Sequence, residues 1–461
     1  MPSLFRKLTR FLTKAPIKPN VAINSVGVRL TRDDHNVSRQ MIDKTALDVL
    51  YGLKRAGYEA YLVGGGVRDL LLGLEPKDFD VVTNASPEEI KSIFKHRCQL
   101  IGRRFRLAHV RFGRQVVEVA TFRGADDSGN DRQVDQAGRL IRDNVYGTLE
   151  EDVWRRDFTV NALYYDIRDY SLVDHVDGMA DIKAGQLRLI GDPDIRYRED
   201  PVRMIRAIRF AAKLGFNIEK QTEAPLFKLG PLLEDVSHAR MFEEVLKLFH
   251  SGVGVEVFEK LRHYDLFKHL FPLTDQLLAS EKDNFPRQLV IESLKSTDRR
   301  IQEDKPVNPA FLFAAFLWEP MLERREQHLE QGLSPQDALY AAASDVLEQQ
   351  IKRTAIPKRF SSQVRDIWNL QFRLGKRFGN RAQQLRAHPR FRAAYDFIGI
   401  RLGAGELELA ELFNWWTEYQ EKDAIEQVAF ANALERPKGK KRPRRTGRNI
   451  YRRKNAEDGE A

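Results

Sequence analysis

Two aspartates that could take part in catalysis, Asp78 and Asp80, are separated by one residue and alternate with Phe79 and Val81. If this stretch is a β-strand, alternate side chains share a face, so both carboxylates project from the same side. Paired carboxylates repel each other unless a cation lies between them, and such hard oxygen ligands suit Mg²⁺ held jointly with phosphate groups. The pair is therefore a candidate metal site, and a solvated strand face is the alternative.

Two further acidic residues could join this pair. Glu118 stands between Val117 and Val119, so on a strand it faces away from both valines and could bring a third carboxylate to the site. Asp157 follows two arginines, and if its stretch is helical, Asp157 and Asn161 share a face at a spacing of four. That face could hold a ribose hydroxyl or orient a metal ligand; an N-cap with solvated arginines is the alternative.

A glycine triplet, Gly64-Gly65-Gly66, precedes a short apolar stretch that contains Arg68. It is not a P-loop, because no Gly-Lys-Ser/Thr follows, and Asp69 stands where the dinucleotide fingerprint needs its third glycine. A turn without side chains still lets backbone amides and a helix start approach a phosphate. A plain tight turn is the alternative.

An arginine stripe follows Asp200-Pro201. Arg203, Arg206 and Arg209 recur at every third position, and on a helix this spacing drifts about 60° per step, which keeps them on one side. Arginine suits phosphates and planar hydrogen bonding with a base. A solvated charged face explains the spacing equally well.

The elements that must position these residues follow from periodicity and capping. Hydrophobic spacing predicts an early helix, then short strands interrupted by turns, and helix starts marked by Ser86 and Thr148. Beyond residue 215 the spacing is mostly helical. We therefore expect an α+β fold: a small α/β head with a mixed or antiparallel sheet, followed by an all-helical neck and body. The expected strands are 58–63, 78–83, 107–112 and 115–122, and the expected helices include 67–72, one that opens at Thr148, and 200–213.

Composition narrows the class of protein. A chain of 461 residues with 42% hydrophobic residues is long enough for several domains with a sizeable core. The single cysteine, Cys98, excludes a disulfide framework and a cysteine-rich zinc site. No apolar run reaches the roughly 18 residues of a membrane helix. These features fit a cytoplasmic enzyme.

The net charge of +10 is carried by the two ends. Residues 436–461 hold 11 basic and 3 acidic residues, and residues 1–20 hold 5 basic and no acidic ones, which leaves the rest of the chain slightly acidic. Basic ends of this kind bind polyanions without reading their sequence. The N-terminus could also make weak contact with an anionic membrane surface.

Five motifs in order resemble one family. They are residues 62–69 (LVGGGVRD), 78–80 (DFD), 118–123 (EVATFR), 155–159 (RRDFT) and 198–203 (REDPVR). Together they resemble the class II nucleotidyltransferases, which include bacterial poly(A) polymerases and tRNA CCA-adding enzymes. Residues 101–110, 355–359 and 388–396 are similar to segments typical of the poly(A) polymerase branch.

The resemblance implies a template-independent polynucleotide adenylyltransferase that adds AMP from ATP to RNA 3′ ends, promoting mRNA decay, by a two-metal in-line mechanism. A CCA-adding enzyme is the first alternative, and a catalytically inactive RNA-binding protein the second. Asp78 and Asp80 correspond to the metal-binding pair, and Glu118 and Asp157 compete as the third catalytic carboxylate. The nucleotide-binding residues that we expect are Gly64, Gly65, Arg68, Arg123, Asn161, Glu199, Asp200, Arg203, Arg206 and Arg209.

The expected cofactor is Mg²⁺ or Mn²⁺, with ATP as substrate. The expected partners are RNA 3′ ends of mRNA, regulatory RNA and decay intermediates, without DNA, and the chain is expected to act as a monomer. The expected domains are a disordered basic N-terminus (1–35), a catalytic head (36–165), a neck that binds nucleobase and RNA (166–235), an RNA-binding helical body (236–435) and a disordered basic tail (436–461).

Overall fold

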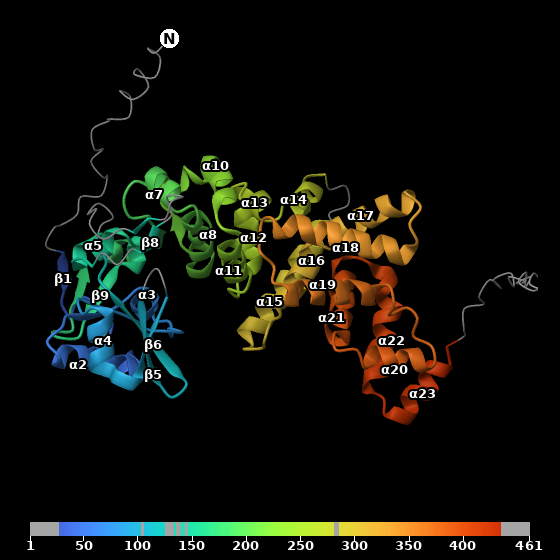
Figure 1. Cartoon of the computed structure of the whole chain (residues 1–461), viewed down its shortest axis with the longest axis horizontal. Coiled ribbons are helices and arrows are strands. Elements are labelled where there is room, and N and C mark those ends of the chain that lie inside the picture. Colours follow the sequence, from blue (N-terminus) through green and yellow to red (C-terminus); the bar gives the residue numbers. More distant parts are fainter. Residues whose placement is uncertain are drawn as a thin grey trace, which may run out of the picture. The chain divides into compact units, whose positions relative to one another are not determined.

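The computed structural model describes residues 27–102, 106–124, 133–134, 140–142, 146–280 and 285–434. Strands are concentrated in the N-terminal part of the chain, and the later described residues are almost entirely helical (Figure 1). The expected α+β architecture is confirmed. The expected ends, residues 1–35 and 436–461, lie outside the described residues except for 27–35.

A mixed sheet of eight strands forms the head, in the order β1-β10-β9-β2-β3-β6-β5-β4. Only β3 and β6 run parallel to each other; every other neighbouring pair in this sheet is antiparallel. The strands are β1 (Val28–Leu30), β2 (Ala60–Val63), β3 (Asp80–Thr83), β4 (Cys98–Ile101), β5 (Leu107–Phe112), β6 (Gln115–Thr121), β9 (Leu163–Asp166) and β10 (Leu172–Asp174).

Helices α2 (Lys44–Arg55) and α4 (Pro87–Phe94) cover one face of this sheet. Asp43 caps α2, and Ser86 with Glu89 forms the capping box that the sequence predicts for α4. Helix α2 packs on β2, β3 and β6, whereas α4 packs on β4 and β5. Helix α3 (Gly65–Leu71) packs on β2 and β9. Helix α5 (Leu149–Trp154) begins with a capping box of Thr148 and Glu151, and its Val153 shares a buried cluster with Tyr61 and Val82.

Helix α8 (Val202–Leu214) carries the arginine stripe and packs on α11 (His238–Phe249) and α12 (Gly254–His263). It ends at Gly215, whose φ of +66° favours glycine, as the sequence predicts. Its buried residues include Val202, Ile205 and Ile208. Burial of this apolar side fixes which way the arginines point.

The remaining elements complete the chain. They are α6 (Gly178–Ala184), α7 (Pro193–Glu199), α9 (Lys220–Glu223), α10 (Leu226–Leu229), α13 (Phe267–Leu270), α14 (Pro272–Ala279), α15 (Phe285–Gln302), α16 (Pro309–Phe316), α17 (Trp318–Glu330), α18 (Pro335–Ile351), α19 (Lys358–Gln371), α20 (Asn380–Arg386), α21 (Phe391–Ala404), α22 (Ala410–Glu421) and α23 (Ala424–Asn432), strands β7 (Gln133–Val134), β8 (Leu140–Arg142), β11 (Gln186–Leu187) and β12 (Asn217–Ile218), and 3₁₀ turns η1 (Arg39–Met41), η2 (Lys95–Arg97), η3 (Thr159–Asn161), η4 (Gly230–Asp235) and η5 (Leu407–Leu409). No helix among the described residues is long and apolar enough to cross a membrane.

Contacts divide the chain into two compact units. The first comprises residues 1–365 and 403–405, and the second comprises residues 366–402 and 406–461. An aromatic core around Trp416 and Tyr419 holds the second unit together. The expected domain boundaries at 165 and 235 fall inside the first unit, so they stay predictions.

Three local expectations need correction. Residues 28–30 form β1 inside the segment expected to be disordered, because their backbone pairs with β10 and Arg29 contacts Asp166 and Asp169. Strand β3 begins at Asp80, so Asp78 lies just before it. The stretch after Arg155 is not an α-helix, since only a 3₁₀ turn at Thr159–Asn161 follows it.

Candidate active site

Three carboxylates gather where the parallel strands β3 and β6 meet. Asp80 and Glu118 are register partners on these strands, and Asp78 lies two residues before Asp80. Burial, followed by the negative charges of Asp78 and Glu118, raises the pKa of the Asp80 carboxyl to about 6. The two aspartates that the sequence places on one strand face are therefore close enough to repel, as is Glu118.

The glycine turn lies against these carboxylates. Gly64 has a φ of +76°, and a Cβ added to it would lie 3.6 Å from Asp80 Oδ2. A Cβ on Gly66 would lie 3.1 Å from the carbonyl oxygen of Asp78 and 3.2 Å from Cδ1 of Phe79. The positive φ favours glycine at position 64, and the close contacts with Asp78 and Phe79 favour it at position 66.

The side chain of Arg68 is buried and does not lie open beside the glycine turn. Its side chain is 3% exposed, and it donates to Asp69 Oδ1 from Nε (2.9 Å) and Nη2 (2.6 Å) and to Asn161 Oδ1 from Nη1 (2.6 Å). The guanidinium carbon lies 5.2 Å from the centroid of the Phe210 ring on α8. Arg68 thus joins α3 to the 159–161 turn and to α8.

Asp157 lies at the centre of the same network. Its Oδ2 accepts from Arg206 Nε (2.9 Å), and its Oδ1 accepts from Asn161 Nδ2 (3.1 Å) and from the Phe158 amide (2.8 Å). Burial opposes ionisation, but these partners outweigh it and hold the pKa of the Asp157 carboxyl below its usual value. Asp157 and Asn161 therefore meet although the α-helix invoked for that contact is absent.

The acidic pair before α8 is also partnered. Glu199 Oε2 accepts from Arg196 Nη1 (2.7 Å) and Arg203 Nη1 (3.1 Å). Asp200 Oδ2 accepts from Nη2 of Arg240 on α11 at 2.7 Å. Sequence reasoning did not single out Arg240, and its distance of 40 residues from Asp200 gave no local signal.

Arg209 and Arg123 complete the expected nucleotide-binding set. The Arg209 guanidinium carbon lies 4.4 Å from the Phe210 ring centroid, and its buried Nε has no hydrogen-bond partner among the described residues. Arg123 is half-buried and forms a β-bridge with Tyr146. Arg206 and Arg209 thus lie against the Phe210 ring, whereas Arg203 contacts Glu199. Arg123 follows the end of β6.

Arg156 is a residue of the site that sequence reasoning left without a role. A Cβ added to Gly64 would lie 3.9 Å from Arg156 Nη1, and the charge of Arg156 lowers the pKa of Asp80. Its guanidinium is fixed by Asp152 Oδ2 and by the hydroxyl of Tyr164, 2.7 Å from its Nε. Asp152 is fully buried. Its position in the Arg-Arg-Asp motif was the sequence signal that could have pointed to it.

The donor set fits a divalent cation. No group of three or more His, Cys, Asp or Glu side chains among the described residues is already arranged around a metal position. Asp78 and Asp80 nevertheless present hard oxygen donors, and burial together with repulsion from Asp78 raises the pKa of Asp80. A cation between them would remove that repulsion, and this arrangement suits Mg²⁺ or Mn²⁺.

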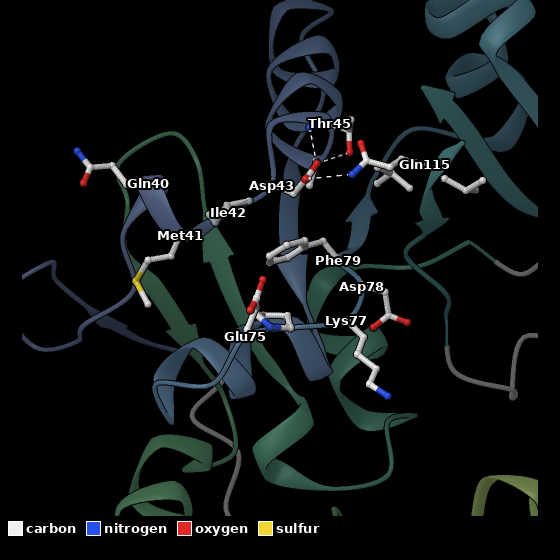
Figure 2. Close-up of a pocket in the computed structure, with 14 residues that line it drawn as sticks. Gln40, Met41, Ile42, Asp43, Thr45, Glu75, Lys77, Asp78, Phe79 and Gln115 are labelled. Atoms are coloured by element: carbon white, nitrogen blue, oxygen red, sulfur yellow. Dashed lines mark hydrogen bonds between the residues drawn. The ribbon is translucent and has the colours of Figure 1, made fainter. Parts of the chain in front are cut away.

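A cavity of about 430 Å³ borders Asp78 on the side of α2 (Figure 2). Lys77 and Phe79 line it from the loop before β3, and Gln115 lines it from β6. Gln115 donates to Asp43 Oδ2 at 3.4 Å, which links the start of β6 to the cap of α2. The cavity therefore lies beside the carboxylates rather than between them and the glycine turn.

Three protein-family models match the chain. "Poly A polymerase head domain" matches residues 60–188, "Probable RNA and SrmB- binding site of polymerase A" matches residues 215–278, and "Polymerase A arginine-rich C-terminus" matches residues 331–449. The three matches follow the chain from the sheet into the second compact unit.

Known relatives agree with these models. Poly(A) polymerase I of Salmonella typhi is 48% identical over 434 residues, which cover 91% of this chain and 93% of the relative. A CCA-adding enzyme of Latilactobacillus sakei is 40% identical over 240 residues, 51% of this chain and 58% of that enzyme. The crystal structure of Bacillus stearothermophilus CCA-adding enzyme in complex with CTP matches at a TM-score of 0.52 and 25% identity, covering 81% of this chain and 80% of that one.

Proposed function

This chain belongs to the poly(A) polymerase family, whose members are polynucleotide adenylyltransferases, and we propose that it extends RNA 3′ ends with AMP from ATP by a metal-assisted in-line transfer. The observation that supports the chemistry most directly is the convergence of Asp78, Asp80 and Glu118 beside a glycine turn. The catalytically inactive alternative loses support, because the carboxylates and the turn are both intact.

Each part of the site has a proposed role. Asp78 and Asp80 would hold the divalent metal, which when bound supplies positive charge for activating the RNA 3′-hydroxyl and for the leaving pyrophosphate. Gly64 and Gly65 leave room for the triphosphate at the start of α3. Arg156, fixed by Asp152 and Tyr164, adds preorganised positive potential next to Asp80.

We further propose Glu118, rather than Asp157, as the third carboxylate of the metal site. Glu118 is the register partner of Asp80 and raises its pKa, whereas Asp157 is engaged by Arg206 and Asn161. Asp157 and Asn161 would then shape the neighbouring nucleotide site together with Arg68. Under this assignment, Glu118→Gln weakens Mn²⁺ binding, measured by electron paramagnetic resonance, and Asp157→Asn leaves it unchanged. Equal loss in both variants would contradict the assignment.

Base selection is assigned to the start of α8. Glu199, Asp200 and Arg203 lie at its N-terminal end, and Arg240 and Arg196 hold the two acidic side chains. Fixed hydrogen-bonding groups can discriminate between an adenine and a cytosine edge, because a mismatched base leaves buried polar groups unpaired. Arg206 and Arg209, farther along the helix, would face the phosphates.

The remaining proposals concern the whole chain. We propose that it acts as a monomer in the cytoplasm on mRNA, regulatory RNA and decay intermediates. Contact of the N-terminus with an anionic membrane is proposed from its basic and apolar residues; that segment lies outside the described residues.

The decisive experiment offers a generic RNA 3′ end and a tRNA lacking its last three nucleotides, with each nucleoside triphosphate separately, in Mg²⁺ and in EDTA. Long products on generic RNA with ATP alone support poly(A) synthesis. Addition of two C and one A, confined to the truncated tRNA, would move the chain to the CCA-adding alternative. Purified Asp78→Ala/Asp80→Ala should stay folded and lose transfer; retained transfer would overturn the proposed site.

A further inference from the structure

The last three strands of the sheet have one covered and one open face. Residues on one side of β4, β5 and β6 are buried under α2 and α4, as at Cys98, Val110 and Val119. The alternate side chains point away from those helices and remain accessible. We call this surface the open face; its residues are Gln99, Ile101, Leu107, His109, Arg111 and Val116, with Glu118 at its edge.

The open face is continuous with the catalytic carboxylates. Strand register places Asp80, Glu118, His109 and Gln99 in one row across β3, β6, β5 and β4. His109 Nε2 lies 3.5 Å from Glu118 Oε1. Because neighbouring strands are about 4.8 Å apart, the row extends about 10 Å beyond Glu118. A molecule that reaches the carboxylates from this side must cross β5.

The side chains of the open face suit single-stranded RNA. Arg111 is exposed, and its guanidinium has no ion pair within the part of the chain that the structure describes. Val116 and Ile101 are 42% and 38% exposed, which gives apolar area beside polar His109 and Gln99. Single-strand-binding surfaces combine cations for the backbone with aromatic rings, histidine among them, or arginine planes on which the bases stack. On the open face, Arg111 is such a cation and His109 such a ring.

The geometry of the sheet separates two approaches to the carboxylates. The glycine turn follows β2, on one side of β3, whereas the open face lies beyond β6, on the other side. In-line phosphoryl transfer requires the attacking and leaving oxygens on opposite sides of the phosphorus. A triphosphate at the glycine turn therefore leaves the β6–β5 side for the attacking 3′-hydroxyl.

We propose that the open face binds the 3′-terminal nucleotides of the RNA primer, with Arg111 contacting a backbone phosphate close to the reacting end. The inference rests on the proposed function and adds the location of the primer. It also assigns Gln99 and His109 a place along the primer path, with His109 next to Glu118.

The test measures binding of oligoadenylates that end in 3′-deoxyadenosine, so that no transfer follows. Fluorescence anisotropy would give Kd over a range of salt for the full chain, Arg111→Gln, and Arg111→Gln/Gln99→Ala. Lys91→Gln is the matched control, because Lys91 is an exposed cation on α4, across the same sheet. We expect Arg111→Gln to raise Kd about threefold to tenfold and to lower the salt slope by about one, with an unchanged KM for ATP.

Comparing a short with a long oligoadenylate shows whether Arg111 contacts the reacting end of the RNA. The penalty of Arg111→Gln should be equal for a short and a long oligoadenylate, because the open face adjoins the carboxylates. A penalty seen only with the long RNA, or one no larger than that of Lys91→Gln, would overturn the proposal. If the unmodified chain binds RNA but transfers no AMP to an ordinary 3′ end, the proposed adenylyltransferase function is wrong. The binding measurements then still decide whether the open face binds RNA.

Discussion

At the residue scale, the site is organised by one carboxyl that is difficult to ionise. The pKa of Asp80 is raised to about 6 because the residue is buried near Asp78 and Glu118, and Arg156 offsets this only in part. By contrast, Asp157 has a lowered pKa because Arg206 and Asn161 engage it. Asp80 therefore lacks a positive partner that balances its charge, whereas Asp157 already has one. An added cation would stabilise the ionised form of Asp80 only.

Removing this carboxylate should make the metal-free protein more stable. Because native Asp80 binds its proton more tightly than an unfolded aspartate, stability should fall as pH rises from about 4 to about 6 and stay reduced above that range. At pH 8 in EDTA, Asp80→Asn should therefore gain about 1 to 3 kcal/mol in the free energy of unfolding and lose transfer activity. Urea unfolding at pH 5 and pH 8 checks this gain, with Asp48→Asn on the exposed side of α2 as control. An Asp80→Asn protein less stable than its parent at pH 8 would contradict the charge balance described for the site.

Arg68 is the residue whose setting departs most from what its motif suggests. The resemblance places it at the triphosphate, and the structure buries it between Asp69, Asn161 and the Phe210 ring. Arg68→Ala would leave the Asp69 carboxylate and the side-chain oxygen of Asn161 without the guanidinium that donates to them, at a cost of about 3 kcal/mol in the free energy of unfolding. Chemical denaturation measures this cost, and Arg198→Ala, an exposed arginine of α7, is the control. A decrease smaller than that of Arg198→Ala would show that the buried contacts contribute little.

At the element scale, local patterns predicted the helix caps and four strands of the eight-stranded sheet, and they missed β1, β4, β9 and β10. Periodicity located β5 and β6, and capping chemistry located the starts of α4 and α5, because both are local signals. The register of Asp80 with Glu118 depends on pairing between strands about 40 residues apart, for which the sequence holds no local signal. The predicted contact between Asp157 and Asn161 is present, but a 3₁₀ turn forms it instead of the expected helix.

The packing of α3 against the loop before β3 leads to a prediction about Gly66. Alanine would normally favour a helix by about 1 kcal/mol over glycine, but here its Cβ would press on the backbone of Asp78 and the ring of Phe79. Gly66→Ala should therefore lower kcat at least about tenfold by shifting Asp78, while the protein stays folded. Steady-state kinetics with circular dichroism checks this, and Gly375→Ala, where a Cβ would meet open space, is the control. An unchanged kcat in Gly66→Ala would mean that the aspartates tolerate the shift.

At the scale of the whole molecule, charge is divided between regions with different tasks. The head places its carboxylates where β3 and β6 meet, while residues 436–461 carry 11 basic and 3 acidic residues. A family model for an arginine-rich C-terminus includes part of that segment. Under the proposed function, the chemistry would depend on a few fixed groups in the head, and long-range attraction for RNA would depend on many charges whose exact positions matter little.

This division predicts how salt acts on a chain that ends at residue 435. If the terminal cations bind phosphates, they release counterions, and the slope of log Kd against log salt falls by about 0.7 for each single-strand phosphate that is no longer neutralised. Deleting residues 436–461 should therefore weaken binding of a long RNA at low salt and flatten its salt dependence, with little change in kcat at saturating RNA. A chain of full length with glutamine in place of the 11 basic residues separates charge from length, and it should behave like the deletion. If the slope stays the same in both variants, residues 1–435 alone bind the RNA.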